Sequence, residues 1–232
     1  MNPTVAVSSG TRAIGILGGT FDPVHFGHLR TALEVLAGCR LAAVHLMPCG
    51  LPPHRDPPVA STELRLRMLR AAVASEPRLI IDERELRRPG PSYMVDSLAQ
   101  CRDEDRARPL CLVLGADAFL GLPSWHRWRD ILGLAHIVVV QRPGWDLRAA
   151  GELGDLLAER RADDPAALHH ATDGLIRVQA VTALDIASSQ IRALVVQGGD
   201  PRFLVPDPVR DLILATGCYR QPPGPKENRL RA

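Results

Sequence analysis

Short, mostly apolar runs alternate with amphipathic segments along most of the chain. The runs predict buried strands, and the segments between them, with apolar positions three and four apart, predict helices. This alternation indicates an α/β fold, a single Rossmann-like doubly wound parallel sheet with helices on both faces. We predict one domain over 1–220 and a disordered tail over 221–232, which is rich in proline and charge. The predicted strands are 13–17, 41–48, 79–82, 110–114, 135–140 and 175–178.

The helices are predicted from the same spacing and from residues that favour helix ends. Gly38 is expected to stop the first helix, and Ser61 or Thr62 to begin the second. Residues 83–88 are charged and are expected to be exposed, whereas residues 163–174 are expected to form a polar loop. The predicted helices cover 29–37, 62–75, 91–101, 147–161, 188–196 and part of 203–217.

Turn residues follow four of the predicted strands. They are Gly18-Gly19, Pro48-Cys49, Gly115-Ala116-Asp117 and Arg142-Pro143. In open parallel sheets, ligands bind at the carboxyl ends of the strands. The four exits therefore predict one shared cleft at that edge of the sheet.

The stretch from Gly18 to His28 joins the first strand to the first helix. Adjacent glycines allow a close approach of the backbone to a ligand, and a helix N-terminus attracts phosphate through its N–H groups. His25 and His28 can add hydrogen bonds to phosphate oxygens. No lysine follows the glycines, which excludes a P-loop, and G-x-G-x-x-G is absent. On residue types alone, a plain glycine turn with two solvated histidines remains open.

A second candidate for phosphate binding lies near the end of the chain. Ser188 and Ser189 open a predicted helix and offer hydroxyl and N–H donors. Arg192, one turn later, can direct its guanidinium at the same anion. An ordinary helix cap with a surface arginine is the alternative.

Composition narrows the class of protein. The chain has 232 residues, and a net charge of +2 gives no indication of a nucleic-acid partner. The five cysteines include no C-x-x-C, so neither a disulfide framework nor a zinc site is predicted, and thiols fit a reducing cytosol. Without a signal-peptide or membrane-span pattern, we expect a cytoplasmic protein. The oligomeric state stays open.

The two phosphate candidates resemble the signatures of one superfamily. His25-Phe26-Gly27-His28 is similar to the H-x-G-H motif of the nucleotidyltransferases, and Ser188 to Arg192 to their C-terminal I-S-S-T-x-x-R motif. The resemblance implies a nucleotidyltransferase-type fold and transfer of a nucleotidyl group from a nucleoside triphosphate, with His25, His28 and Arg192 as catalytic residues. The implied ATP site comprises Gly18, Gly19, Thr20, Phe21, His25, His28, Gly115, Asp117, Ser188, Ser189 and Arg192.

Five further stretches resemble bacterial nicotinate-nucleotide adenylyltransferases, and the resemblance spans about residues 13–219. The stretches are Pro52-Pro53-His54-Arg55, Glu85 to Tyr93, Gly115-Ala116-Asp117, Pro123-Ser124-Trp125 and Arg142-Pro143-Gly144. The family implies ATP and nicotinate mononucleotide as substrates, and Mg²⁺ bound through the ATP phosphates. The implied acceptor site comprises His54, Arg55, Ser92, Tyr93, Met94, Asp117, Trp125 and Arg142. Another phosphorylated acceptor, such as nicotinamide mononucleotide or phosphopantetheine, and a non-catalytic nucleotide sensor are the alternatives.

The acceptor half departs from the family pattern at three places. Met94 replaces a threonine, Cys49 and Gly50 stand where asparagine is common, and His126 replaces an aromatic residue. Several acceptor residues also have structural alternatives. Trp125 and Trp128 could both be core residues, Asp117 a helix cap, and His54-Arg55 the tip of a solvated loop.

Overall fold

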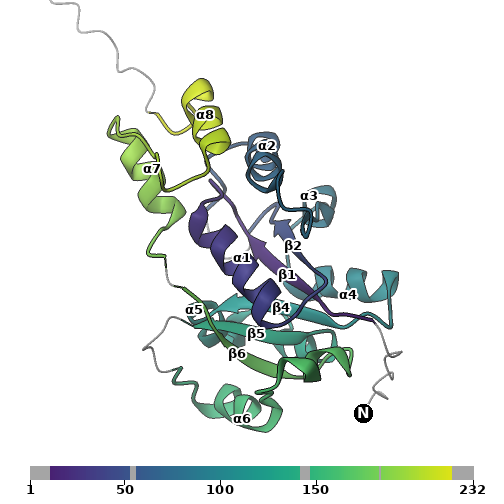
Figure 1. Ribbon diagram of the computed structural model, residues 1–232. Coiled ribbons are helices and arrows are strands. Elements are labelled where there is room, and N and C mark those ends of the chain that lie inside the picture. The colour runs from purple at the N-terminus through teal and green to yellow at the C-terminus, as the bar shows by residue number, and fades with distance from the viewer. Residues whose placement is uncertain (1–10, 53–55, 142–146, 183, 221–232) are drawn as a thin grey trace, which may run out of the picture.

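The sheet has six parallel strands in the order β3-β2-β1-β4-β5-β6 (Figure 1). The computed structural model describes residues 11–52, 56–141, 147–182 and 184–220. All six strands were predicted from the sequence, as was their parallel, doubly wound arrangement. Their bounds are β1 Ile14–Gly19, β2 Ala43–Pro48, β3 Leu79–Ile81, β4 Leu110–Gly115, β5 His136–Gln141 and β6 Ile176–Ala180.

Helices connect the strands and follow the last one. No described helix is both long enough and apolar enough to cross a membrane. The α-helices are α1 Phe26–Gly38, α2 Thr62–Val73, α3 Arg84–Arg87, α4 Met94–Glu104, α5 Ala116–Leu120, α6 Gly151–Arg160, α7 Ser188–Val196 and α8 Asp207–Thr216. Three short 3-10 helices are η1 Leu122–Ser124, η2 Trp128–Gly133 and η3 Pro165–His169.

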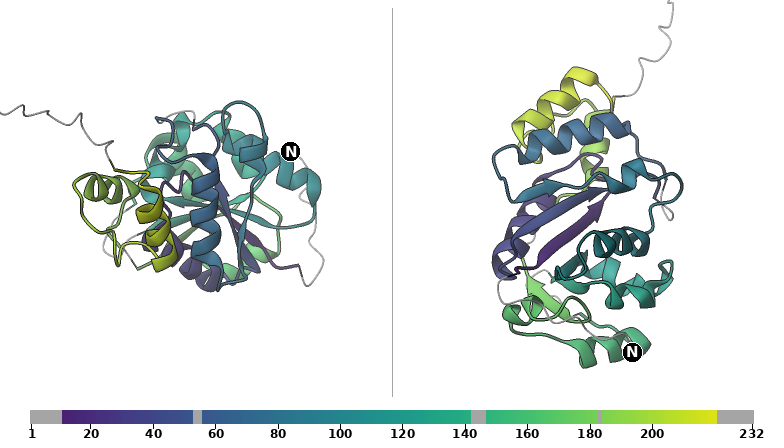
Figure 2. Two further views of the ribbon diagram at one scale, coloured as in Figure 1. Left: turned by 90° about the horizontal axis from the view of Figure 1, so that it is seen from above. Right: turned by 90° about the vertical axis from the view of Figure 1, so that its right-hand side faces the viewer.

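An apolar layer covers each face of the sheet, with helices outside it (Figure 2). Strand β4 shows why its sequence is continuously apolar: Cys111 and Val113 pack with α1 and α2, whereas Leu110, Leu112 and Leu114 pack with α4. Helices α7 and α8 extend the first layer, and α8 packs on α2. Burial on both faces is the property that makes parallel strands readable from sequence.

The topology places a crevice between β1 and β4. The chain leaving β1 enters α1, which packs on one face, whereas the chain leaving β4 enters α5, whose Phe119 packs on the other. Connections that diverge in this way leave a gap at the carboxyl ends of two neighbouring strands, where ligands bind in this architecture.

The predicted end of α1 is confirmed, whereas the predicted exposure of residues 83–88 is wrong because close packing overrides sequence preference. Helix α1 ends at Gly38, and a Cβ there would lie 2.7 Å from the Gln179 side chain. The glycine thus allows β6 to approach the helix. Residues 83–88 include α3, and Glu85 is 3% exposed. Its carboxylate accepts a hydrogen bond from the Ser97 hydroxyl at 2.6 Å, and burial raises its pKa.

Candidate active site

A cleft of about 470 Å³ opens at the crevice between β1 and β4. Its walls are the carboxyl ends of both strands, the segment after β2, the start of α4 and the segment around Trp125. Nine of the predicted site residues line it: Gly18, Gly19, Thr20, Ser92, Tyr93, Met94, Gly115, Asp117 and Trp125. Sequence reasoning did not assign Glu85, which also lines the cleft.

The glycines of the β1 exit serve close approach rather than an unusual backbone conformation. Gly18 and Gly19 belong to β1, and a Cβ at Gly18 would lie 2.7 Å from the Met94 methyl carbon. The left-handed residue of the turn is Phe21, with a φ of 48°. Left-handed backbone is rare for bulky residues and indicates a turn held by its surroundings.

The two histidines of the H-x-G-H motif lie against each other at the start of α1. Their ring centroids are 3.7 Å apart, and the rings are nearly parallel at 27°. The His25 backbone N–H donates to His28 Nδ1 at 3.4 Å. A neutral imidazole that accepts at Nδ1 carries its proton on Nε2. His28 therefore presents Nε2–H as a hydrogen-bond donor.

Burial makes both imidazoles neutral at physiological pH. It lowers the pKa of His25 to about 4, and burial together with the neighbouring His25 lowers the pKa of His28 to about 3. The His28 ring contacts both the His25 ring and the Phe21 ring, whose centroid is 5.0 Å away in a T-shaped arrangement. A phosphate anion beside the rings would favour their protonated forms and so raise both pKa values.

The C-terminal motif docks directly on the turn before α1. Arg192 donates from one guanidinium nitrogen to the Asp22 carbonyl at 2.7 Å, and the Ser188 hydroxyl donates to the Pro23 carbonyl at 2.9 Å. Ala187 rather than Ser188 is the N-cap of α7. Arg192 is therefore not a detached surface residue, and the two motifs form one structural unit. Ser189 lies exposed beside them.

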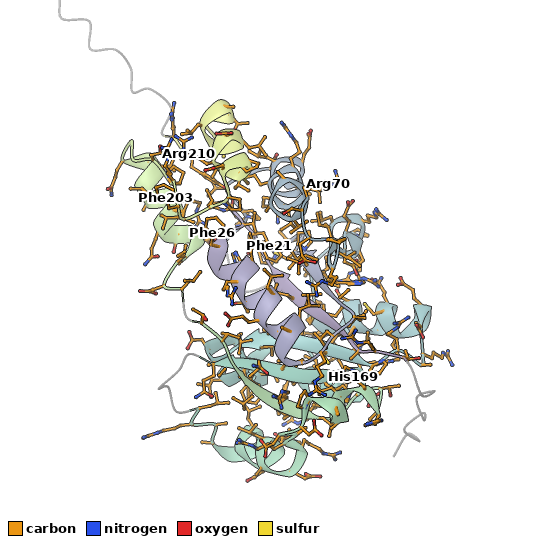
Figure 3. All side chains as sticks on the ribbon, in the orientation of Figure 1. Phe21, Phe26, Arg70, His169, Phe203 and Arg210 are labelled. Atoms are coloured by element: carbon orange, nitrogen blue, oxygen red, sulfur yellow. The ribbon has the colours of Figure 1, made fainter. Side chains whose placement is uncertain are left out.

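Helix α7 is held in place by the segment that follows it. The Phe26 N–H donates to the Leu204 carbonyl at 3.1 Å, so the chain between α7 and α8 also lies against the start of α1 (Figure 3). Because Ser188, the first residue of α7, contacts Pro23 just before α1, the N-terminal ends of α1 and α7 lie side by side.

Asp22 connects this unit to the rest of the chain, a role that sequence analysis did not predict. Its side chain is buried and accepts hydrogen bonds from the backbone N–H groups of Val59 at 2.7 Å and Ala60 at 3.1 Å. The Tyr219 hydroxyl donates to it at 2.6 Å, and burial followed by the carboxylate raises the pKa of that hydroxyl. Asp22 lies within the Gly18–His28 string, but no local pattern identifies partners this far away.

The acceptor side of the cleft is aromatic. Trp125 lines the cleft, whereas Trp128 is buried in the core, so the two tryptophans have different roles. The rings of Tyr93 and His126 lie beside each other, with centroids 4.3 Å apart. Asp117 is in the first turn of α5, whose N-cap is Gly115, so the alternative in which Asp117 caps the helix does not hold. Three predicted acceptor residues, His54, Arg55 and Arg142, lie outside the described residues.

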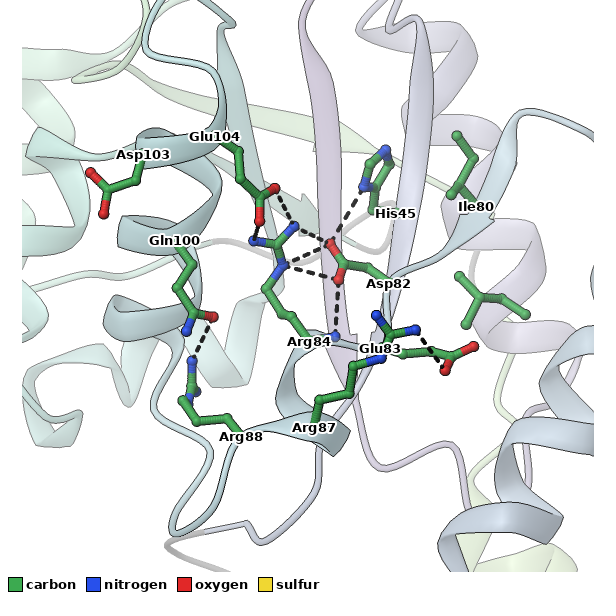
Figure 4. A pocket seen from close by; sticks show the side chains of 11 residues that line it. His45, Ile80, Asp82, Glu83, Arg84, Arg87, Arg88, Gln100, Asp103 and Glu104 are labelled. Carbon is green, nitrogen blue, oxygen red and sulfur yellow. Dashed lines mark hydrogen bonds and ion pairs between the residues drawn. The ribbon is translucent and has the colours of Figure 1, made fainter.

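A second hollow, of about 690 Å³, lies beside β3, α3 and α4 (Figure 4). Its charged side chains pair with one another. Arg84 contacts Asp82 at 2.8 Å and Glu104 at 3.1 Å, and His45 approaches Asp82 at 3.6 Å. Because these charges satisfy one another and no predicted site residue lines this hollow, the smaller cleft is the candidate active site.

Comparisons with known proteins agree with this geometry. The cytidylyltransferase-like family model matches residues 16–194. The "Probable nicotinate-nucleotide adenylyltransferase" of Methylococcus capsulatus is 50% identical over 207 residues, which are 89% of this chain and 99% of that protein. The protein of the same name from Halorhodospira halophila is 46% identical over 211 residues, 91% of this chain and 97% of its own.

Solved structures show the same fold at low sequence identity. The Plasmodium falciparum nicotinic acid mononucleotide adenylyltransferase complexed with NaAD has a TM-score of 0.65 and 15% identity, over 90% of this chain and 97% of that chain. Fold and family model together make this protein a nucleotidyltransferase. The identity to its relatives over most of the chain is more specific. The chain belongs to the nicotinate-nucleotide adenylyltransferase family.

The Asp22 contacts predict a specific stability effect. Replacing Tyr219 by Phe keeps the ring but removes the hydroxyl that donates to the buried carboxylate. We expect the free energy of unfolding to fall by about 1–3 kcal/mol, measured by urea denaturation. In an Asp22→Asn background the same replacement should cost much less, because the charged acceptor is already gone. An equal cost in both backgrounds would contradict the assignment.

Proposed function

We propose that the protein transfers AMP from ATP to nicotinate mononucleotide in NAD biosynthesis in the cytoplasm. The products are nicotinate adenine dinucleotide, also called deamido-NAD, and pyrophosphate. The observation that carries the proposal is the docking of Arg192 and Ser188 on the Asp22-Pro23 segment, which joins the two motifs into one unit directly after the Gly18–Thr20 segment that lines the cleft. The family of the chain supports the same reaction.

The chemistry needs positioning more than acid–base catalysis. A 5′-phosphate oxygen of the acceptor attacks the α-phosphorus of ATP in line, and a new P–O bond forms. The bond from the α-phosphorus to the bridging oxygen breaks, and its electron pair leaves with pyrophosphate. The nucleophile is already an anion, so the protein has to align the groups and stabilise the charge that develops.

The residues of the turn have distinct parts in this proposal. His28 presents a neutral Nε2–H donor. The N–H groups of Phe26 and His28 donate to backbone carbonyls, so among the first three residues of α1 the Gly27 N–H is the one that no described hydrogen bond uses and that could bind the same anion. Arg192 has further guanidinium N–H groups beyond the nitrogen bonded to Asp22 and is 30% exposed at its side chain. Because the Ser188 hydroxyl donates to Pro23, its backbone N–H is the group left for a phosphate.

The acceptor would lie along the aromatic wall. Helix α4 begins at Met94, and the first N–H groups of a helix have no partners within it. Such N–H groups suit a carboxylate, which accepts hydrogen bonds only. Trp125 and the Tyr93–His126 pair provide flat apolar surfaces for a pyridine ring. His54, Arg55 and Arg142 remain candidates for the acceptor phosphate.

Mg²⁺ is part of the proposal as a companion of ATP. It prefers oxygen ligands and usually keeps several waters, so phosphate oxygens can supply most of its ligands. The described residues include no group of three His, Cys, Asp or Glu placed to hold a metal ion. The cleft does offer the exposed Asp117 carboxylate. When bound, Mg²⁺ would neutralise phosphate charge while the protein groups align the reactants.

The first functional prediction separates catalysis from binding. His28→Ala should lower kcat about 10²–10³-fold, as loss of one donor to a developing anion does, with a smaller change in ATP affinity. Arg192→Ala should act more on the KM for ATP. Exposed His170, remote from the cleft, provides the matched control, and His170→Ala should behave as wild type. Near-normal turnover of His28→Ala would remove its catalytic role.

The second functional prediction concerns the acceptor. The acid, nicotinate mononucleotide, should be preferred over its amide about 100-fold or more in kcat/KM, because two charged hydrogen bonds to N–H groups contribute about 1.5–3 kcal/mol each. Met94 should not abolish the preference if the donors are backbone N–H groups. Equal specificity constants would reject the acid preference but leave adenylyl transfer intact.

The third functional prediction concerns the metal. Turnover should stop in EDTA and return with Mg²⁺, because the charge on the triphosphate is then neutralised again. Metal analysis of the purified protein should show no stoichiometric zinc. Bound zinc that is lost together with activity would contradict the proposal.

A further inference from the structure

Arg65 is the most deeply buried charged residue at the edge of the cleft. It lies in α2 and is 1% exposed. Charged side chains are rarely buried without a partner of opposite charge. Within the described part of the chain its hydrogen bonds go to uncharged oxygens only, and its Nε has no acceptor. A burial this unfavourable calls for a role beyond filling the core.

One nitrogen of Arg65 joins the ends of two strands. It donates to the Thr20 carbonyl at 2.8 Å and to the Cys49 carbonyl at 2.9 Å. The β1–β2 pairing ends immediately before these residues, where the Cys49 N–H donates to the Gly19 carbonyl at 2.9 Å. Beyond this point the segments that follow β1 and β2 separate. Arg65 therefore donates a hydrogen bond to the next carbonyl of each segment, where strand pairing no longer provides a donor.

The two segments lead to opposite sides of the cleft. From Thr20 the chain continues through Phe21 to the histidines at the start of α1. From Cys49 it continues to Gly50, whose N–H donates to the Ser92 hydroxyl at 2.9 Å just before α4. The guanidinium thus contacts both the nucleotide side and the acceptor side through one hydrogen-bonding group.

Each carbonyl that Arg65 contacts shares a peptide plane with an N–H that points the opposite way. For Thr20 this is the N–H of Phe21, and for Cys49 it is the N–H of Gly50. A cation on the carbonyl oxygen polarises the peptide and strengthens the N–H as a donor. A change in charge at one peptide therefore acts on the other through the shared guanidinium.

We infer that Arg65 is a positioning residue that couples the nucleotide-side turn at Thr20 to the acceptor-side residues Cys49 and Gly50, which are joined to Ser92. The inference rests on the proposed function for the identity of the two ligands. The anionic triphosphate brings the opposite charge that Arg65 lacks among its described contacts. Binding at the turn then orders the acceptor segment before the acceptor arrives.

Hydrogen–deuterium exchange on the full chain tests the coupling with one ligand only. The segment 48–52 carries three exchangeable amides, because its first and last residues are prolines. With Mg²⁺ and α,β-methylene ATP, exchange in this segment of the wild type should slow about 5-fold or more. In Arg65→Lys, which keeps the charge but loses the planar fork, the analogue should still bind and the slowing should be lost.

A matched control lies two residues away on the same helix. Arg67 is exposed, and Arg67→Lys should retain the wild-type slowing. Ser92→Ala provides a second disrupting variant with Arg65 intact, and it too should lose the slowing at Gly50. In steady state, Arg65→Lys should raise the KM for both substrates together, whereas a purely structural role would lower thermal stability without this paired effect.

Two results would overturn the inference. One is a wild type in which the analogue leaves exchange in 48–52 unchanged, and the other is an Arg65→Lys protein that keeps the slowing. Neither depends on the acceptor, because the exchange experiment uses the ATP analogue alone. Failure of the proposed function would instead show as a wild type that binds the analogue but forms no dinucleotide from ATP and nicotinate mononucleotide.

Discussion

The buried carboxylate of Asp22 is the constraint on which the arrangement of the site depends. A carboxylate removed from water needs donors on its oxygens, and Asp22 obtains them from Val59, Ala60 and Tyr219. The three donors come from the segment before α2 and from the end of the chain. The hydrogen bonds to this one carboxylate therefore bring together segments that are far apart in sequence. Asp22 itself lies in the turn that leads to both histidines.

The turn is held from the opposite side by a buried charge of the other sign. Arg65 donates a hydrogen bond to the Thr20 carbonyl, and Arg192 donates one to the Asp22 carbonyl. The Asp22 side chain accepts hydrogen bonds from backbone N–H groups before α2. The partners in these hydrogen bonds, namely Arg65, Arg192 and the segment before α2, lie outside the turn. A left-handed Phe21 can persist in such a turn because the surroundings fix the backbone on both sides of it. Preorganisation of this kind suits a reaction that depends on alignment.

Much of the fold was readable from the sequence because its signals are local. Each strand is buried on both faces, so it appears as an apolar run, and each helix covers one face, so its apolar positions recur at helical spacing. The two motifs proposed to bind phosphate were also readable, because His25, His28 and Ser188 lie near helix starts. The structure brings Arg192 to the same turn, but no local pattern contains that contact.

Buried polar residues marked the limit of sequence reasoning. Glu85 was expected to be exposed with its charged neighbours, yet Ser97 from the next helix provides a donor for it. In the sequence, Arg65 is one of several arginines on an amphipathic helix. Only its hydrogen bonds to the carbonyls directly after β1 and β2 distinguish it from the exposed Arg67. Whether such residues are buried depends on hydrogen-bond partners that are distant in sequence, and the whole fold decides where those partners lie.

The neutral state of the histidines follows from the same packing and shapes the chemistry. The rings of His25 and His28 stack on each other, and burial lowers both pKa values far below neutrality. Because both rings are neutral, the turn offers hydrogen-bond donors without two adjacent positive charges that would repel each other. In the proposed reaction, the charge that would favour protonation arrives with the triphosphate and grows as pyrophosphate leaves. Stabilisation is then strongest where the reaction requires it, which is the condition for lowering a barrier rather than only tightening binding.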